Sequence, residues 1–178
     1  MIYRLIVFLL FDLGILVTGF GQNHTPKLVF PEKPFYDYNC TRFLSEESII
    51  TAYHNSARIY NYDSQALVLS ETISLDSDPI SIDVNDEFIY IVDWNKNLYI
   101  INKVDYSNIQ KFHLDYIPKV LKVVGKNLFV LSDSTCSFYQ ENIFVKTFNF
   151  NSRIVGLSAK ENFIEYFTSN GVPFVSFG

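Results

Sequence analysis

The sequence predicts an all-β chain built from about four repeats of a four-stranded antiparallel unit. The first observation is a short apolar segment followed by an apolar residue and a tyrosine, which recurs at intervals of about forty residues. The copies are Ile50–His54 with Ile59 and Tyr60, Ile89–Asp93 with Leu98 and Tyr99, and Phe129–Asp133 with Phe138 and Tyr139. The second is that β-branched and aromatic residues dominate, while no long segment has the apolar spacing of an amphipathic helix.

Residues 1–21 have the organisation of an export signal. Arg4 precedes an apolar run over Leu5–Phe20, and Gly19 and Gly21 are small residues suited to a cut before Gln22. The run contains an aspartate, which is costly at a bilayer centre, and it is short for a membrane span. We therefore expect a cleaved signal peptide, with a signal anchor or a buried strand as alternatives. The chain is predicted to be secreted or extracellular, either alone or as part of a larger ectodomain, with no further membrane span.

Residues 22–40 read as an extended leader, because they hold three of the six prolines. Two Asn-x-Thr triplets in this segment make Asn23 and Asn39 candidate glycosylation sites. The chain has two cysteines, Cys40 and Cys136, and an oxidising compartment makes a disulfide between them a candidate. The alternative is two buried thiols.

The repeats begin at residue 41 and give four units, 41–75, 80–115, 120–151 and 154–178. The strands expected in the first two are 42–44, 49–53, 58–62 and 67–75, then 80–84, 88–92, 98–101 and 109–114. Those expected in the last two are 120–124, 128–131, 137–139 and 144–150, then 154–157, 163–167 and 172–176. The ends of the units also align without a gap, since Leu75, Leu114 and Phe150 occupy the same place.

The second strand of each unit is its most apolar, as in Phe88–Val92 and Leu128–Leu131. An unbroken apolar strand is buried on both faces, which requires a sheet on either side. The gap-free matches favour such stacked units over a β-sandwich. On this evidence residues 41–178 resemble the blades of β-propellers, of a loose extracellular or periplasmic type. The WD40 pairs and the kelch glycine doublet are missing, so the resemblance assigns no functional residue.

The fourth unit lacks an outermost strand, which leaves an exposed sheet edge. Two arrangements are open. Leu28–Phe30 of the leader pairs with Val172–Ser176 and closes a four-bladed ring, or the units belong to an incomplete larger ring.

Charge and motifs bound the chemistry. The net charge is −5 and there is no basic run, so nucleic acid is not an expected partner. The three histidines are far apart, and no catalytic, metal or cofactor motif is found. Asp93 and Asp133, which the repeat alignment makes equivalent, are expected to start turns rather than to act as acids.

The loops after each second strand and the links between units are expected on one face, where binding residues of a rigid scaffold usually lie. Candidates on this face are Trp94, Asp93, Asn95, His54 and Asp133. Trp94 is expected to pack over its own unit, with an exposed position as the alternative. The predicted function is a non-catalytic scaffold for an unidentified protein partner. A hydrolase or lyase with acidic residues at the central channel, and a truncated piece of a larger ectodomain, are the alternatives.

Overall fold

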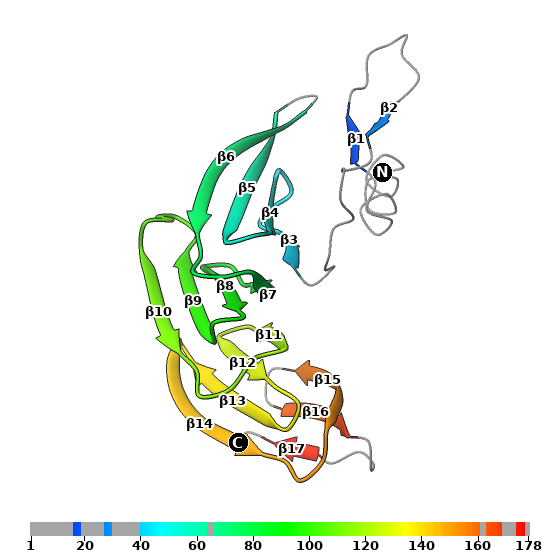
Figure 1. Cartoon of the computed structure of the whole chain (residues 1–178), viewed down its shortest axis with the longest axis vertical. Helices are drawn as coiled ribbons and strands as arrows, with labels where there is room; N and C mark the ends of the chain where they lie inside the picture. The colour runs from blue at the N-terminus through cyan, green and yellow to red at the C-terminus, as the bar shows by residue number, and fades with distance from the viewer. Residues whose placement is uncertain are drawn as a thin grey trace.

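The computed structural model describes residues 16–18, 27–29, 40–63, 66–160, 163–168 and 174–176, with side chains for 40–62 and 66–154. All regular elements in this part of the chain are β-strands, and all strand pairs are antiparallel. Three four-stranded sheets and one three-stranded sheet follow one another around an arc (Figure 1). The predicted all-β, propeller-like fold is confirmed.

Each sheet is one blade, and its strands are neighbours in sequence. Blade 1 contains β3 (Thr41–Phe43), β4 (Ser48–Ala52), β5 (Ser56–Asp63) and β6 (Ala66–Ser74). Blade 2 contains β7 (Pro79–Val84), β8 (Phe88–Asp93), β9 (Asn97–Asn102) and β10 (Ile109–His113). Blade 3 contains β11 (Val120–Val124), β12 (Asn127–Leu131), β13 (Thr135–Gln140) and β14 (Ile143–Asn149). Blade 4 contains β15 (Ile154–Lys160), β16 (Phe163–Thr168) and β17 (Phe174–Ser176). In the first three blades these bounds lie within about two residues of those expected from the apolar pattern.

The blades fan out from a concave side. The innermost strands β3, β7, β11 and β15 lie on this side of the arc, and the outermost strands β6, β10 and β14 lie on the convex side (Figure 1). Among the described side chains, the hydrophobic core forms three clusters, one at each junction between consecutive blades. The core is therefore a row of interfaces between stacked sheets, as the repeat pattern predicts.

The second strand of blade 2 shows why these strands are apolar throughout. Ile89, Tyr90, Ile91 and Val92 are each at most 1% exposed. Ile89 and Ile91 pack into the cluster shared with blade 1, while Tyr90 and Val92 pack into the cluster shared with blade 3. Successive side chains of a strand point to opposite faces, so a sheet between two others needs apolar residues at every position. Each such buried side chain stabilises the fold by about 1.5–3 kcal/mol.

The predicted alignment of the repeats is wrong by one residue at the second strand. The last residues paired across the following hairpin are Ala52, Val92 and Leu131, whose partners are Ala57, Leu98 and Cys136. Each of these three residues faces the following blade. Ala52 lies in the cluster between blades 1 and 2, Val92 in the cluster between blades 2 and 3, and Leu131 in the cluster between blades 3 and 4. The sequence alignment instead places Val92 opposite Ser132. A slip of one residue moves every side chain of a strand to the other face, so the correct alignment decides which residues are buried.

The ring is not closed by the leader. β2 (Lys27–Val29) pairs with β1 (Leu16–Thr18), while β17 pairs with β16. Blades 1 and 4 lie at opposite ends of the arc (Figure 1). The closed four-bladed arrangement is therefore wrong, and the observed arrangement is an open arc. Pairing between nearby segments closes a shorter loop and costs less entropy than joining the two ends of the chain.

Several N-terminal predictions fall on residues that are not described. Apart from Leu16–Thr18, the expected signal peptide lies outside the described residues, as do Asn23, Asn39 and Phe30. Within the described part of the chain, no helix has the length and apolar character needed to cross a membrane.

Candidate interaction face

The hairpins after each second strand lie at the same end of the blades as the links that lead to the next blade. In each of the first three blades, one backbone hydrogen bond joins the end of the fourth strand to the hairpin of the same blade. The N–H groups of Leu75, Leu114 and Phe150 donate to the carbonyls of Asn55, Lys96 and Ser134, at 2.8, 2.7 and 2.8 Å. We call this end the hairpin face; it comprises residues 53–56, 76–78, 93–97, 115–119, 132–135 and 150–153. The aligned ends of the predicted units are confirmed by these bonds.

Asp93 does not present its carboxylate on this face, because it is fully buried. Its Oδ1 accepts a hydrogen bond from the Asn97 N–H at 2.8 Å, and its Oδ2 accepts from Asn97 Nδ2 and the Tyr99 hydroxyl, both at 3.0 Å. The Tyr99 hydroxyl in turn accepts from the Asp76 N–H at 2.9 Å. Burial is the main cause of a raised pKa at Tyr99, which keeps its proton on the hydroxyl. Asp93 is thus the turn-forming residue that was expected, but it is not an exposed binding residue.

Trp94 is the residue that the hairpin of blade 2 exposes. Trp94 is 59% exposed. The prediction that it packs over its own blade is therefore wrong, and the alternative of an exposed position is confirmed. Its backbone is held on both sides, since the Trp94 N–H donates to the Asp78 carbonyl at 3.1 Å and the Asn95 N–H donates to Ser77 Oγ at 2.9 Å. An aromatic side chain therefore projects into solvent from a fixed turn.

His54 lies beside this turn, although it belongs to blade 1. Its Nδ1 is 3.8 Å from the carboxylate of Asp78, the link residue that also accepts the Trp94 N–H. The imidazole packs against the ring of Tyr53, with 3.9 Å between ring centroids. We call His54, Asp78, Trp94 and Asn95 the Trp94 patch. The structure thus brings three of the predicted candidates together at the junction of blades 1 and 2.

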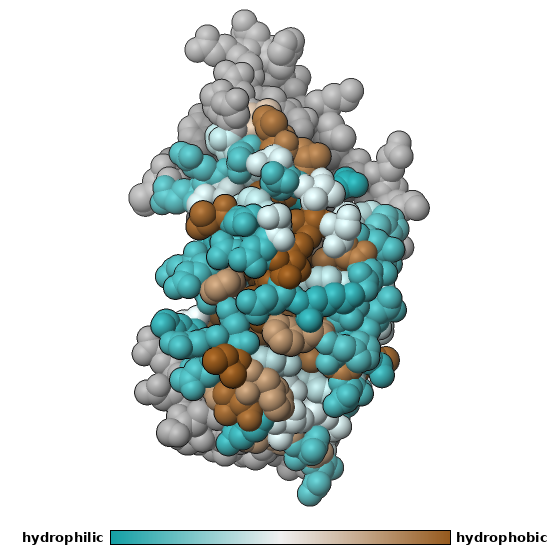
Figure 2. Space-filling view, turned by 90° about the vertical axis from the view of Figure 1, so that its left-hand side faces the viewer, coloured by the Kyte–Doolittle hydropathy of each residue, from teal (hydrophilic) through white to brown (hydrophobic). Residues whose placement is uncertain are grey.

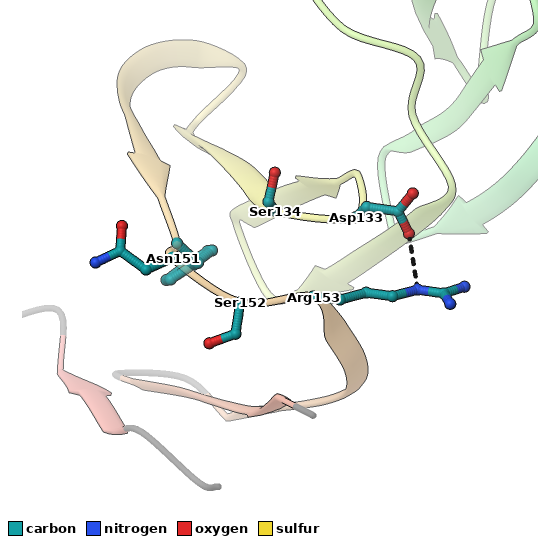
Figure 3. Close-up of a pocket in the computed structure, with 6 residues that line it drawn as sticks. Asp133, Ser134, Asn151, Ser152 and Arg153 are labelled. Carbon is teal, nitrogen blue, oxygen red and sulfur yellow. Dashed lines mark hydrogen bonds and ion pairs between the residues drawn. The ribbon is translucent and has the colours of Figure 1, made fainter. Parts of the chain in front are cut away.

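Asp133 belongs to a different junction, between blades 3 and 4. Its carboxylate binds Lys119 Nζ at 2.7 Å and Arg153 Nε at 3.2 Å. The hydrogen bond from Lys119 is the main cause of a lowered pKa at Asp133. The side chain lines a shallow depression of about 540 Å³, shown in Figure 3, whose other lining residues are Ser134, Phe150, Asn151, Ser152 and Arg153. Asp133 and Asp93 are therefore not equivalent, as the corrected alignment requires.

The concave side holds a charged group that the sequence analysis did not single out. Asp83, on the innermost strand of blade 2, binds Arg42 Nε at 3.2 Å and accepts the Val123 N–H at 2.8 Å. Lys122 Nζ lies 3.8 Å from the same carboxylate. Among the described side chains of β3, β7 and β11, Asp83 is the only carboxylate. A hydrolase or lyase site was expected to bring several carboxylates together on this side. An acidic residue within a mostly apolar innermost strand is the signal that could have identified it.

The predicted disulfide is not formed. Cys40 packs in the cluster between blades 1 and 2, and Cys136 packs in the cluster that blade 3 directs towards blade 4. The sheets of blades 2 and 3 separate the two clusters, so the thiols cannot meet. Burial raises the pKa of Cys136 to about 12.

No three His, Cys, Asp or Glu side chains within the described residues are placed to share a metal ion. His54 and His113 lie on separate blades, and His24 lies outside the described residues.

Comparison with known proteins yields no matching family model and no matching curated protein. Among solved structures, a BBS1N chain in complex with ARL6DN, soaked with lead, is 14% identical, with a TM-score of 0.60 over 76% of this chain and 45% of that one. The mercury-soaked crystal gives 13% identity and a TM-score of 0.60 over 78% and 50% of the two chains. The computationally designed Ika4 protein is 10% identical, with a TM-score of 0.61 over 75% of this chain and 88% of that one. The chain spans about half the length of the BBS1N chains. At these identities the likeness shows a propeller-like fold alone.

Proposed function

We propose that this chain is a secreted, non-catalytic recognition domain that binds a protein partner through the Trp94 patch. The observation that carries the proposal is a tryptophan 59% exposed on a turn whose backbone is fixed. Tryptophan is enriched among the residues that dominate binding energy at protein interfaces. Covering so large an apolar side chain removes its surface from water, which would contribute to the free energy of association.

The turn below Trp94 favours binding because it is ordered before a partner arrives. Asp93, Asn97 and Tyr99 form a buried hydrogen-bonded network directly beneath it. A preorganised loop loses little conformational entropy on association, so more of the contact energy appears as affinity. His54 and Asn95 supply polar groups around the aromatic ring, in keeping with the polar rim of a typical interface.

Two further observations support the proposal. The BBS1N structure with the similar fold is a complex with ARL6DN, so a chain with a propeller-like fold can be crystallised with a protein partner. The organisation of residues 1–21 supports export, which places the partner outside the cell or within the secretory pathway.

The test is affinity capture with the full chain, secreted from cells, followed by identification of retained proteins by mass spectrometry. Trp94→Ala should weaken retention of a genuine partner at least tenfold, which corresponds to about 1.4 kcal/mol. Phe43→Ala is the matched control, because it removes an aromatic side chain that is 48% exposed on β3 and belongs to no proposed binding surface. Addition of the purified partner should also shift the emission of Trp94, the single tryptophan. If every retained partner bound the Trp94→Ala chain as tightly as wild type, the proposal would be contradicted.

A further inference from the structure

The end of the blades opposite the hairpin face exposes apolar side chains in each of the first three blades. Tyr62 in blade 1 is 52% exposed, Val104 in blade 2 is 94% exposed, and Ile143 in blade 3 is 70% exposed. They lie at or near the hairpins that join the third and fourth strands. Figure 2 shows hydrophobic patches of this kind on the convex surface formed by the outermost strands. Val68, Leu69 and Phe144 extend the apolar surface along these strands.

A repeated hydrogen bond sets the hairpin between the first two strands beside these apolar residues. The Tyr62 N–H donates to the Glu47 carbonyl at 2.7 Å, and the Lys103 N–H donates to the Glu87 carbonyl at 2.9 Å. The Glu141 N–H donates to the Lys126 carbonyl at 3.0 Å in blade 3. Each blade therefore presents a charged loop and an exposed apolar residue at the same point, and successive blades repeat the combination along the arc.

The charge at this end is predominantly negative. Its described loops, 44–47, 85–87, 102–108, 125–126 and 141–142, carry six carboxylates and two lysines: Glu46, Glu47, Asp86, Glu87, Asp105 and Glu141, with Lys103 and Lys126. Lys126 forms an ion pair with Glu141 at 2.7 Å. Lys103 Nζ donates to the carbonyls of Leu44 and Asn85 at 2.9 and 3.0 Å. The excess negative charge thus lies on blades 1 and 2, beside Tyr62 and Val104.

We propose that this end, the acidic apolar rim, is a second docking surface for a basic amphipathic segment of a protein partner. The rim is defined by Tyr62, Val104 and Ile143 with Glu47, Glu87 and Asp105. Apolar contacts would bury the exposed side chains, and lysine or arginine residues would pair with the carboxylates. A second copy of the chain would bring like charges together, and an anionic membrane surface would be repelled. Charge therefore selects the basic partner among these occupants.

The experiment measures fluorescence anisotropy of a labelled model peptide of leucine and lysine at helical spacing, titrated with the full chain. Two control peptides replace either the leucines by serine or the lysines by glutamate. Only the leucine–lysine peptide should bind, and its affinity should fall as salt rises from 50 to 500 mM, because exposed charges are screened. Val104→Ser and Glu87→Lys should each weaken binding about tenfold, whereas Trp94→Ala should leave it unchanged. This last variant separates the rim from the Trp94 patch.

Both rim substitutions are at exposed positions, and far-UV circular dichroism with thermal unfolding would establish that the variants fold. Equal binding of the serine–lysine peptide, or binding unaffected by either variant, would overturn the proposal. So would dimerisation of the chain in light scattering that Val104→Ser abolishes, which would assign the rim to a second copy. Binding of the chain to vesicles of zwitterionic lipid that Val104→Ser abolishes would assign it to a membrane instead.

Discussion

Replacing Tyr99 by phenylalanine would remove one oxygen atom from the network that supports the turn of Trp94. The Tyr99 hydroxyl donates to Asp93 Oδ2 at 3.0 Å and accepts from the Asp76 N–H at 2.9 Å. The hydroxyl thus connects Asp93, at the end of the second strand in blade 2, to Asp76, in the segment between blades 1 and 2. The substitution leaves the aromatic ring in place, so it tests the hydrogen bonds rather than the packing.

The expected loss in the free energy of unfolding is about 2–4 kcal/mol. A hydrogen bond to a charged group contributes about 1.5–3 kcal/mol, and a buried group left without a partner costs about 1–3 kcal/mol. Asp93 is fully buried and would keep only its bonds to Asn97. Asp76 is exposed, so water can replace the bond to its N–H and reduce the second contribution. For a domain of this size the midpoint of thermal unfolding should fall by roughly 6–12 °C.

The assay is urea unfolding followed by far-UV circular dichroism, with Tyr139→Phe as the control. Tyr139 is buried to the same degree as Tyr99, but its ring contacts Phe112 and Phe144. We expect Tyr139→Phe to change the free energy of unfolding by less than about 1 kcal/mol. Equal losses of unfolding free energy in the two variants would show that the Tyr99 hydroxyl adds no more stability than the hydroxyl of Tyr139, which occupies the same place in the sequence repeat.

Three further predictions follow from burial, and a fourth follows from the N-terminal sequence. Ellman's reagent should not react with the folded chain, because Cys40 and Cys136 are buried. In denaturant without reductant it should detect two thiols. Detection of fewer than two would favour the disulfide. Burial raises the pKa of Tyr90 to about 12, whereas the pKa of the unfolded chain is about 10. The contribution of this hydroxyl to stability is therefore complete below pH 10 and is lost as the pH rises towards 12. The free energies of unfolding at pH 9 and pH 11 should differ less in Tyr90→Phe than in wild type. Phe129→Ala removes a ring stacked on Phe138 with 5.1 Å between centroids, and denaturation should show a loss of about 3–5 kcal/mol, whereas an exposed substitution on β14 should cost under about 0.5 kcal/mol. Mass spectrometry of the secreted chain should find an N-terminus at residue 22 and glycans on the two Asn-x-Thr triplets; retention of residues 1–21 would favour the anchor.

The strands could be predicted because burial between two sheets leaves a strong mark on the sequence. A strand such as β8 must be apolar at every position, and four such units repeat at nearly constant spacing. The closure of the ring could not be predicted in the same way. Whether Lys27–Val29 pairs with β1 or with β17 depends on where distant segments lie, and local pattern carries no information about that.

Three of the four residues of the Trp94 patch could be predicted from the sequence, but the exposure of Trp94 and the burial of Asp93 could not, and the reason is a difference of one residue. Four residues separate Ala52 from Ala57 and Leu131 from Cys136, whereas five separate Val92 from Leu98. The longer hairpin closes through the buried Asp93 carboxylate, which binds the Asn97 N–H, and Trp94 then stands at the exposed tip. Asp93 and Asp133 are identical residues forty positions apart, so the repeat pattern predicts the same role for both. The binding site we propose lies where blade 2 departs from its neighbours, since an added residue in a hairpin can expose a side chain without disturbing the sheets below it.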